Sequence, residues 1–118
     1  MRTPKRILDR RRAVRVEESM PFKIGHDDFE FEARTINLSH NGALCLVDKE
    51  IPIMTKLRVA ISLPGPNGAA VTVKAGGVVV RKEREPQSDK FYVAVYFARI
   101  KPSDQRLLKE FIDRRLEG

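Results

Sequence analysis

The sequence predicts an all-β domain: a small closed barrel of six antiparallel strands with one C-terminal α-helix and a flexible basic arm at the N-terminus. Three observations support this fold class. Short runs in which apolar and polar residues alternate fill residues 22–97, and turn residues separate these runs. Apolar residues then recur at helical spacing over residues 107–116. A sheet of six short strands avoids exposed edges by closing on itself, which favours a barrel.

The first two strands are predicted on either side of a turn at residues 25–28. The first strand begins with residues 22–24. The second strand has alternating apolar side chains on its buried face: Phe29, Phe31 and Ala33. Its alternation changes phase before Ile36 and Leu38, which are expected to face the core. We therefore expect a β-bulge near Thr35.

Four further strands and a helix follow. The third strand contains Leu44 and Leu46, and the apolar run around Cys45 predicts a buried thiol. The next three strands have apolar side chains at alternate positions: Leu57, Val59, Ile61 and Leu63; Val71, Val73 and residues 78–80; Phe91, Val93, Val95 and Phe97. The pair Gly76-Gly77 predicts a sharp bend in the fifth strand. Ser103 is expected to cap a helix with one apolar stripe: Leu107, Leu108, Phe111, Ile112 and Leu116.

The excess positive charge is concentrated at the N-terminus. The chain has a net charge of +7, and residues 1–16 contain seven basic side chains against one acidic side chain. We divide the chain into a flexible basic arm, residues 1–19, and a barrel with its helix, residues 20–118. A basic arm of this kind indicates an anionic partner, which can be a nucleic acid, an anionic membrane surface or a small phosphorylated ligand.

Composition disfavours several functional classes. No apolar run is long enough to span a membrane, which takes about 18 residues. Cys45 is the single cysteine of the chain, which fits a protein of the reducing cytoplasm. The two histidines and this cysteine are not clustered, so we expect no metal site. No pairing of a nucleophile with a base is visible, so we expect no catalytic residues.

Two short motifs combine residue types that recognise phosphates and purine bases. Arg11-Arg12-Ala13-Val14-Arg15 ends the arm, and Asn37-Leu38-Ser39-His40-Asn41-Gly42 ends the second strand, where Asn37 and Ser39 share a face. An arginine fork fits guanine or phosphate oxygens bidentately, and its plane stacks on a purine. The Asn37 amide can pair with a base edge, and the Ser39 hydroxyl can donate or accept a hydrogen bond. Gly42 lets the backbone turn tightly or approach a ligand.

In their order and spacing these motifs resemble the PilZ domain family, whose pattern is RxxxR followed by (D/N)xSxxG. Gly77-Val78-Val79-Val80-Arg81 is similar to the GxVxR-type strand of that family, and residues 92–97 are similar to its closing strand. The resemblance covers residues from about 10 to 116. One departure is Ala94, where the family often has glycine; we expect this change to affect packing and not the ligand residues.

The resemblance implies a barrel of PilZ type that binds cyclic di-GMP and is not an enzyme. The implied ligand residues are arginines of the arm, residues of the second motif and one arginine of the fifth strand: Arg10, Arg11, Arg12, Arg15, Asn37, Ser39, Gly42 and Arg81. We expect the arm to close over the ligand and a protein partner to recognise the new surface. Motility, adhesion or exopolysaccharide control are the implied processes.

Arg10 indicates how many cyclic di-GMP molecules bind to each chain. Cyclic di-GMP can self-associate as an intercalated dimer, which needs additional positive charge and a planar group to cap its stacked guanines. Arg10 immediately precedes the RxxxR pair and can supply both. We therefore expect two ligand molecules per chain, although Arg12 offers the same chemistry.

Alternative interpretations remain open at this point. The arm can be a solvated basic tail, residues 37–42 an ordinary turn, and Arg81 a member of a surface ion pair. The domain can be a ligand-free PilZ-like module that binds only protein. It can also be a small barrel that binds RNA or single-stranded DNA. Nucleic acid is disfavoured because the aromatic rings needed for base stacking are assigned mainly to the core face: Phe29, Phe31, Phe91 and Phe97. This leaves Tyr92 and Tyr96 for stacking.

Overall fold

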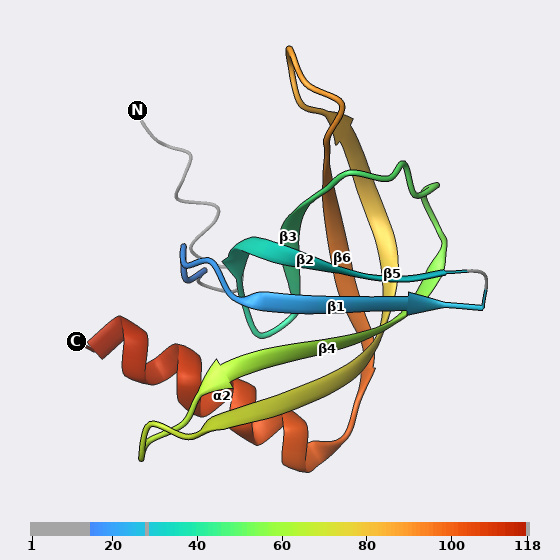
Figure 1. Ribbon diagram of the computed structural model, residues 1–118. Helices are drawn as coiled ribbons and strands as arrows, with labels where there is room; N and C mark the ends of the chain where they lie inside the picture. The colour runs from blue at the N-terminus through green and yellow to red at the C-terminus, as the bar shows by residue number, and fades with distance from the viewer. Residues whose placement is uncertain (1–14, 28, 118) are drawn as a thin grey trace, which may run out of the picture.

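The computed structural model describes residues 15–27 and 29–117. Six antiparallel strands close into a barrel in the order β1-β2-β3-β6-β5-β4, and β1 pairs with β4 to complete it (Figure 1). The strands are β1 Pro21–His26, β2 Phe29–Leu38, β3 Gly42–Val47, β4 Lys56–Pro64, β5 Ala70–Arg84 and β6 Phe91–Ile100, and the helix is α2 Pro102–Glu117. The predicted mainly-β barrel with a C-terminal helix is confirmed. The arm residues 1–14 lie outside the described residues.

Irregularities in strand pairing bend the barrel where the sequence changes phase. The register of β2 against β3 shifts between Thr35 and Asn37, which confirms the predicted bulge. The register of β5 against β6 shifts between Gly76 and Gly77, as predicted, and again between Val79 and Arg81. A bulge increases the local twist, so these shifts let short strands curve enough to close the sheet.

Alternate strand residues and one face of α2 make a single core. The predicted inward residues of β4 are all buried: Leu57, Val59, Ile61 and Leu63. On β3 the core receives Ala43, Cys45 and Val47, and neighbouring Leu44 is only half-buried. The Cys45 thiol is fully buried, as predicted, and its desolvation raises its pKa to about 12, because the charged thiolate is disfavoured away from water.

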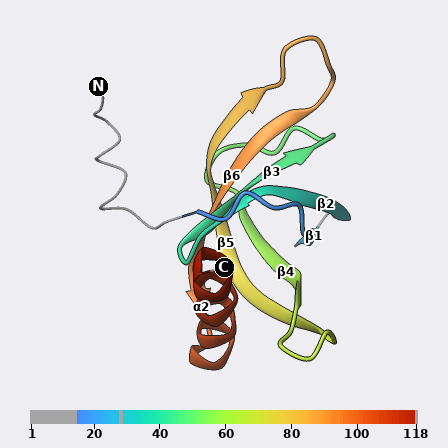
Figure 2. The ribbon, with the colours of Figure 1, turned by 90° about the vertical axis from the view of Figure 1, so that its left-hand side faces the viewer.

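The helix lies across one end of the barrel, and the β5–β6 hairpin extends from the other (Figure 2). Ser103 is not the cap: α2 begins at Pro102, and the amide of Gln105 donates to the Lys101 carbonyl at 2.8 Å. Proline is favoured at the first helical position, where its missing N–H costs no hydrogen bond. The prediction that Leu116 belongs to the apolar stripe of α2 is wrong. Leu116 is 50% exposed, because the contact of α2 with the core ends at Ile112.

Two other expectations about single elements are corrected. The turn predicted at residues 25–28 is shorter, because the backbone of β1 continues to His26, opposite Phe29. Ile36 was expected to face the core, but it is half-buried and lies outside the core cluster. The cause is the bulge, which places Thr35 and Leu38 on the buried side instead.

Candidate ligand-binding site

The end of the arm is paired with the strand that carries the second motif. Val16 and Leu38 form an antiparallel bridge, with N–O distances of 2.8 and 2.9 Å in the two directions. Val16 is 7% exposed and belongs to the core cluster. Residues 15–19 were expected to be part of a flexible arm, but their described contacts bind them to the barrel. The reason is that Val16 adds an apolar side chain to the core, which the basic composition of the arm concealed.

This bridge brings the two motifs together. Arg15, the second arginine of RxxxR, donates a hydrogen bond from Nη1 to Asn37 Oδ1 at 2.8 Å. The two residues are 22 positions apart in the chain and the bond lies at an exposed site. The guanidinium of arginine has five N–H donors, and this bond uses one of them. The other donors of Arg15 can still bind a ligand. The first three arginines of the predicted site, Arg10 to Arg12, lie outside the described residues.

Thr35 binds residues 18–20 to β2, a role that was not predicted from the sequence. Its amide donates to the Met20 carbonyl at 3.0 Å, and its Oγ1 accepts from the Met20 amide at 2.9 Å. The same hydroxyl donates to the Glu18 carbonyl at 2.7 Å. Thr35 is only 2% exposed, and its bond with the Met20 amide is buried, which shields that bond from water. The sequence signal for this role was the presence of a hydroxyl residue at the predicted bulge.

Ser39 organises the turn between β2 and β3. Its Oγ accepts from the amides of Asn41 and Gly42, both at 3.2 Å, and donates to the Gly42 carbonyl at 3.3 Å. The side chain is 1% exposed. Asn37, in contrast, is half-buried and reaches the exposed Arg15. The two polar residues that the sequence placed on one face therefore have different environments.

Alanine variants should separate these two environments. We expect Ser39→Ala to lower the free energy of unfolding by about 1–3 kcal/mol, because it removes the acceptor for the buried Gly42 amide. We expect Asn37→Ala to leave the melting temperature unchanged within error and to weaken ligand binding. Thermal melts followed by circular dichroism, beside a titration of each variant, measure both effects. Equal melting temperatures for the Ser39 variant and the parent would contradict the structural role of this turn.

Gly42 is required by a close approach between strands. A Cβ at this position would lie 2.2 Å from the Val95 carbonyl oxygen and 3.3 Å from Tyr96 Cα. The φ angle of Gly42 is not positive. Among the described glycines, only Gly68 has a positive φ. The amide of Phe97 also donates to the Asn41 carbonyl at 2.7 Å, which binds the same turn to β6. Gly42 therefore allows β3 and β6 to pack closely. Because it has no side chain, it leaves the neighbouring Tyr96 uncovered.

Cross-strand pairing continues the site across the outer face of the barrel. Asn37 pairs with Leu44, Leu44 with Ala94, and Ala94 with Arg81, so one row crosses β2, β3, β6 and β5. Three strand spacings separate the ends of this row by about 14 Å. We call these four residues the cross-strand row. It joins the predicted site residues Asn37 and Arg81 on a single surface, with small or apolar side chains between them.

The cross-strand row ends on β5 at an exposed guanidinium, and an exposed aromatic ring lies beside the row. The Arg81 guanidinium is 79% exposed and lies 3.9 Å from Glu83, a distance that leaves it free to take another anion. Tyr96 lies beside the row, between Gly42 and Val78, and is 51% exposed. An exposed aromatic ring next to a bare glycine offers a face for stacking.

Helix α2 contacts both motif-bearing segments. Arg115 donates from Nε and Nη2 to the two carboxylate oxygens of Glu18, at 2.7 and 3.1 Å, and this bond raises the pKa of Arg115. In the β2–β3 turn, His40 Nε2 lies 4.0 Å from Asp113 Oδ1. The hydrogen bond from Lys109 holds the pKa of Asp113 below its usual range, so Asp113 stays charged beside His40. The helix is therefore in a position to respond to changes in either segment.

Within the described ranges, no three His, Cys, Asp or Glu side chains are grouped as metal ligands would be. No described helix is both long and apolar enough to cross a bilayer.

Comparison with protein-family models matches residues 9–114 to the PilZ domain. The chain belongs to the PilZ family. The match includes both motifs, the cross-strand row and most of α2, so the resemblance inferred from the two motifs is confirmed over nearly the whole chain. No match was found among curated proteins.

Solved structures support the same fold. The inhibitor of motility MotI/DgrA of Bacillus subtilis superimposes with a TM-score of 0.77 and 24% sequence identity, over 91% of this chain and 52% of that one. The chain thus spans about half the length of that protein. The PilZ domain of YcgR from Escherichia coli, solved with c-di-GMP, superimposes with a TM-score of 0.65 and 16% identity, over 92% of each chain.

Proposed function

We propose that this chain is a receptor for cyclic di-GMP that acts by binding and not by catalysis. The observation that carries the proposal is the hydrogen bond from Arg15 to Asn37, which joins the two ligand motifs in a chain of the PilZ family. The PilZ domain of YcgR was solved with c-di-GMP, which supports this choice among phosphorylated ligands. The single thiol, Cys45, is in keeping with a cytoplasmic receptor.

In this proposal the ligand lies on the cross-strand row. Arg11 and Arg15 contact its phosphates and guanine edges from one side, and Arg10 and Arg12 add charge. Asn37 pairs with a base edge at one end of the row, and Arg81 holds an anionic group at the other. Tyr96 gives a guanine a face on which to stack. Ser39 and Gly42 contribute by holding the turn in shape, as their buried contacts require.

Calorimetric titration with cyclic di-GMP, GTP and a short oligonucleotide in parallel tests the function. The proposal requires cyclic di-GMP to bind more tightly than either alternative, because only it offers two guanines and two phosphates in one ring. Tighter binding of the oligonucleotide would support a nucleic-acid protein. Failure of all three to bind would indicate a module that recognises protein alone.

The arm is proposed to close on the ligand and present a new surface to a protein partner in motility, adhesion or exopolysaccharide control. The hinge must lie before Val16, because the Val16 amide already donates to the Leu38 carbonyl. In hydrogen-exchange mass spectrometry we expect ligand to slow exchange at residues 10–15, with Val16 protected in both states. Equal exchange at residues 10–15 with and without ligand would contradict closure of the arm.

We also propose that two cyclic di-GMP molecules bind per chain, because Arg10 can cap a stacked dimer and add positive charge beside it. Arg10→Leu is expected to reduce the stoichiometry from about two to about one, since it removes both the charge and the planar group. Calorimetry and analytical ultracentrifugation of the parent and the variant measure this number. A parent that binds one ligand, or a leucine variant that still binds two, would exclude this role for Arg10.

A further inference from the structure

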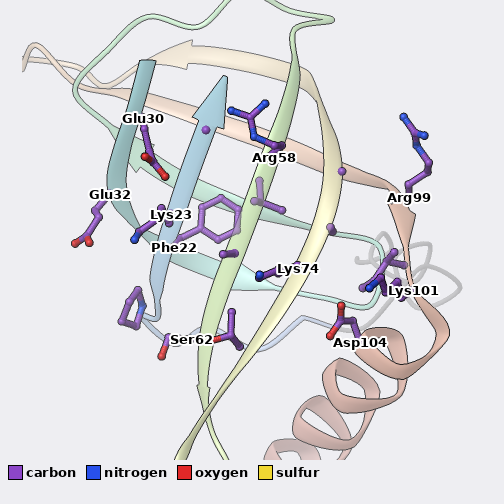
Figure 3. A pocket seen from close by; sticks show the side chains of 18 residues that line it. Phe22, Lys23, Glu30, Glu32, Arg58, Ser62, Lys74, Arg99, Lys101 and Asp104 are labelled. Atoms are coloured by element: carbon purple, nitrogen blue, oxygen red, sulfur yellow. The ribbon is translucent and has the colours of Figure 1, made fainter. Parts of the chain in front are cut away.

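A second concave surface lies on a different part of the barrel from the two motifs. It is a hollow of about 1020 Å³ over the outer faces of β1, β4 and β5, bordered by the end of β6 and the start of α2 (Figure 3). Among the described residues of the two motifs, neither Arg15 nor any of residues 37–42 lines it. Its volume is at the upper end of the range of about 300–1,000 Å³ that is typical of ligand pockets. We call it the β4 hollow.

Basic side chains dominate its rim. Five cations line the hollow: Lys23, Arg58, Lys74, Arg99 and Lys101. Three acidic side chains lie at its margins: Glu30 and Glu32 on β2, and Asp104 on α2. Figure 3 shows the two glutamates together on one side, with the cations spread from there across β4 and β5 to the start of the helix. The surface across β4 and β5 is therefore the part that attracts an anionic partner.

The strand register gives each cation on β4 and β5 a small neighbour. Ala60 lies directly between Lys23 and Lys74 across three strands. In the next outward-facing row, Arg58 lies between Gly25 and Gly76. Gly76 in turn separates Arg58 from Arg99 on β6. Small residues thus alternate with the cations across the sheet. An extended peptide segment lying on the sheet can therefore approach the strand backbone between the cations.

Most of these cations have no partner within the described part of the protein. Lys23, Lys74, Arg99 and Lys101 make no side-chain hydrogen bond or ion pair to any described residue. Arg58 lies 3.6 Å from Asp27, and both side chains are highly exposed, at 70% and 90%. Such an exposed pair contributes little to stability and is easily exchanged for another carboxylate.

The lining disfavours two kinds of occupant. The only aromatic residue among the lining side chains is Phe22, which is 1% exposed, so a nucleotide or single-stranded nucleic acid would have no ring on which to stack its bases. The basic arm of this chain, residues 1–14, is repelled by the same charges that would attract an anion.

We propose that the β4 hollow binds an extended acidic segment of a protein partner. Side chains on one face of an extended segment repeat every ~6.8 Å, which is also the spacing of the rows of Arg58 and Ala60 along β4. Alternate carboxylates of such a segment reach successive rows of cations. Between the cations, Ala60, Gly25 and Gly76 make room for its backbone. The inference goes beyond cyclic di-GMP binding and assigns the partner a place on the barrel.

Fluorescence anisotropy with a labelled peptide in which glutamate alternates with serine tests the proposal. We expect saturable binding to the full chain that weakens as NaCl is raised, because exposed ion pairs are screened. The double variant Lys23→Glu/Lys74→Glu should weaken binding roughly tenfold or more, since it places two carboxylates beside those of the peptide. Its titration with cyclic di-GMP should match that of the parent, which keeps this test separate from that of the ligand site.

Matched controls distinguish the hollow from general charge. Arg84→Glu/Arg106→Glu makes the same change in net charge outside the hollow and should leave peptide binding within about twofold of the parent. Ala60→Leu keeps every charge and fills the space between Lys23 and Lys74, and we expect it to weaken peptide binding roughly tenfold or more as well. Equal losses in both charge variants, unchanged binding by Ala60→Leu, or tighter binding of an oligothymidylate than of the peptide would each overturn the proposal.

Discussion

Replacing Arg15 with alanine is expected to weaken cyclic di-GMP binding at least about tenfold, because a hydrogen bond to a charged group contributes about 1.5–3 kcal/mol. Arg15 contacts the second motif directly, through its bond to Asn37. The variant also frees the Asn37 carbonyl, which can then turn away from the ligand. The melting temperature should change little, since this bond is exposed and the Val16 bridge does not depend on it.

Two further variants sharpen this experiment. Arg15→Lys keeps the charge but loses the bidentate fork, so its affinity should fall between those of the parent and the alanine variant. Arg106→Ala removes an exposed arginine of α2 and controls for net charge. Titration calorimetry at fixed ionic strength gives all the dissociation constants. A parent-like dissociation constant for Arg15→Ala would remove Arg15 from the site, and Arg11→Ala applies the same test to the first arginine of the motif.

Gly42→Ala is expected to have the largest effect on folding. Its Cβ would meet the Val95 carbonyl oxygen at 2.2 Å, and a backbone oxygen cannot rotate away as a side chain can. The strands β3 and β6 must then separate, which we expect to cost about 3 kcal/mol or more, at the upper end for overpacked sites. For a domain of this size that corresponds to a fall of ~10 °C or more in melting temperature.

Gly76→Ala is the matched control for this substitution. Its Cβ would have Arg99 Cβ at 3.6 Å as its nearest neighbour, which is an ordinary contact, and it would face the outside of the barrel. Its melting temperature should stay within about 4 °C of the parent value, the shift that one kcal/mol or less produces. Equal melting temperatures for Gly42→Ala and Gly76→Ala would show that β3 and β6 are not as tightly packed as the structure has them.

Much of the fold follows from local patterns in the sequence. The alternation of Leu57, Val59, Ile61 and Leu63 determines which face of β4 is buried, because successive strand residues point to opposite sides. Breaks in alternation revealed the bulge after Thr35 and the bend at Gly76-Gly77 for the same reason. The order and spacing of the two motifs were enough to indicate the PilZ family, which the match over residues 9–114 confirms.

Long-range packing decided the features that local patterns could not. The basic composition of residues 1–16 concealed Val16, which is buried only because Leu38 and the core lie next to it. Ser39 and Gly42 were assigned to the ligand from their residue types, and their burial against the turn and β6 is a property of strands distant in the chain. The cross-strand row and the β4 hollow likewise arise from register between strands. Local sequence specifies which face of a strand is apolar, and only the closed barrel specifies which residues of different strands become neighbours.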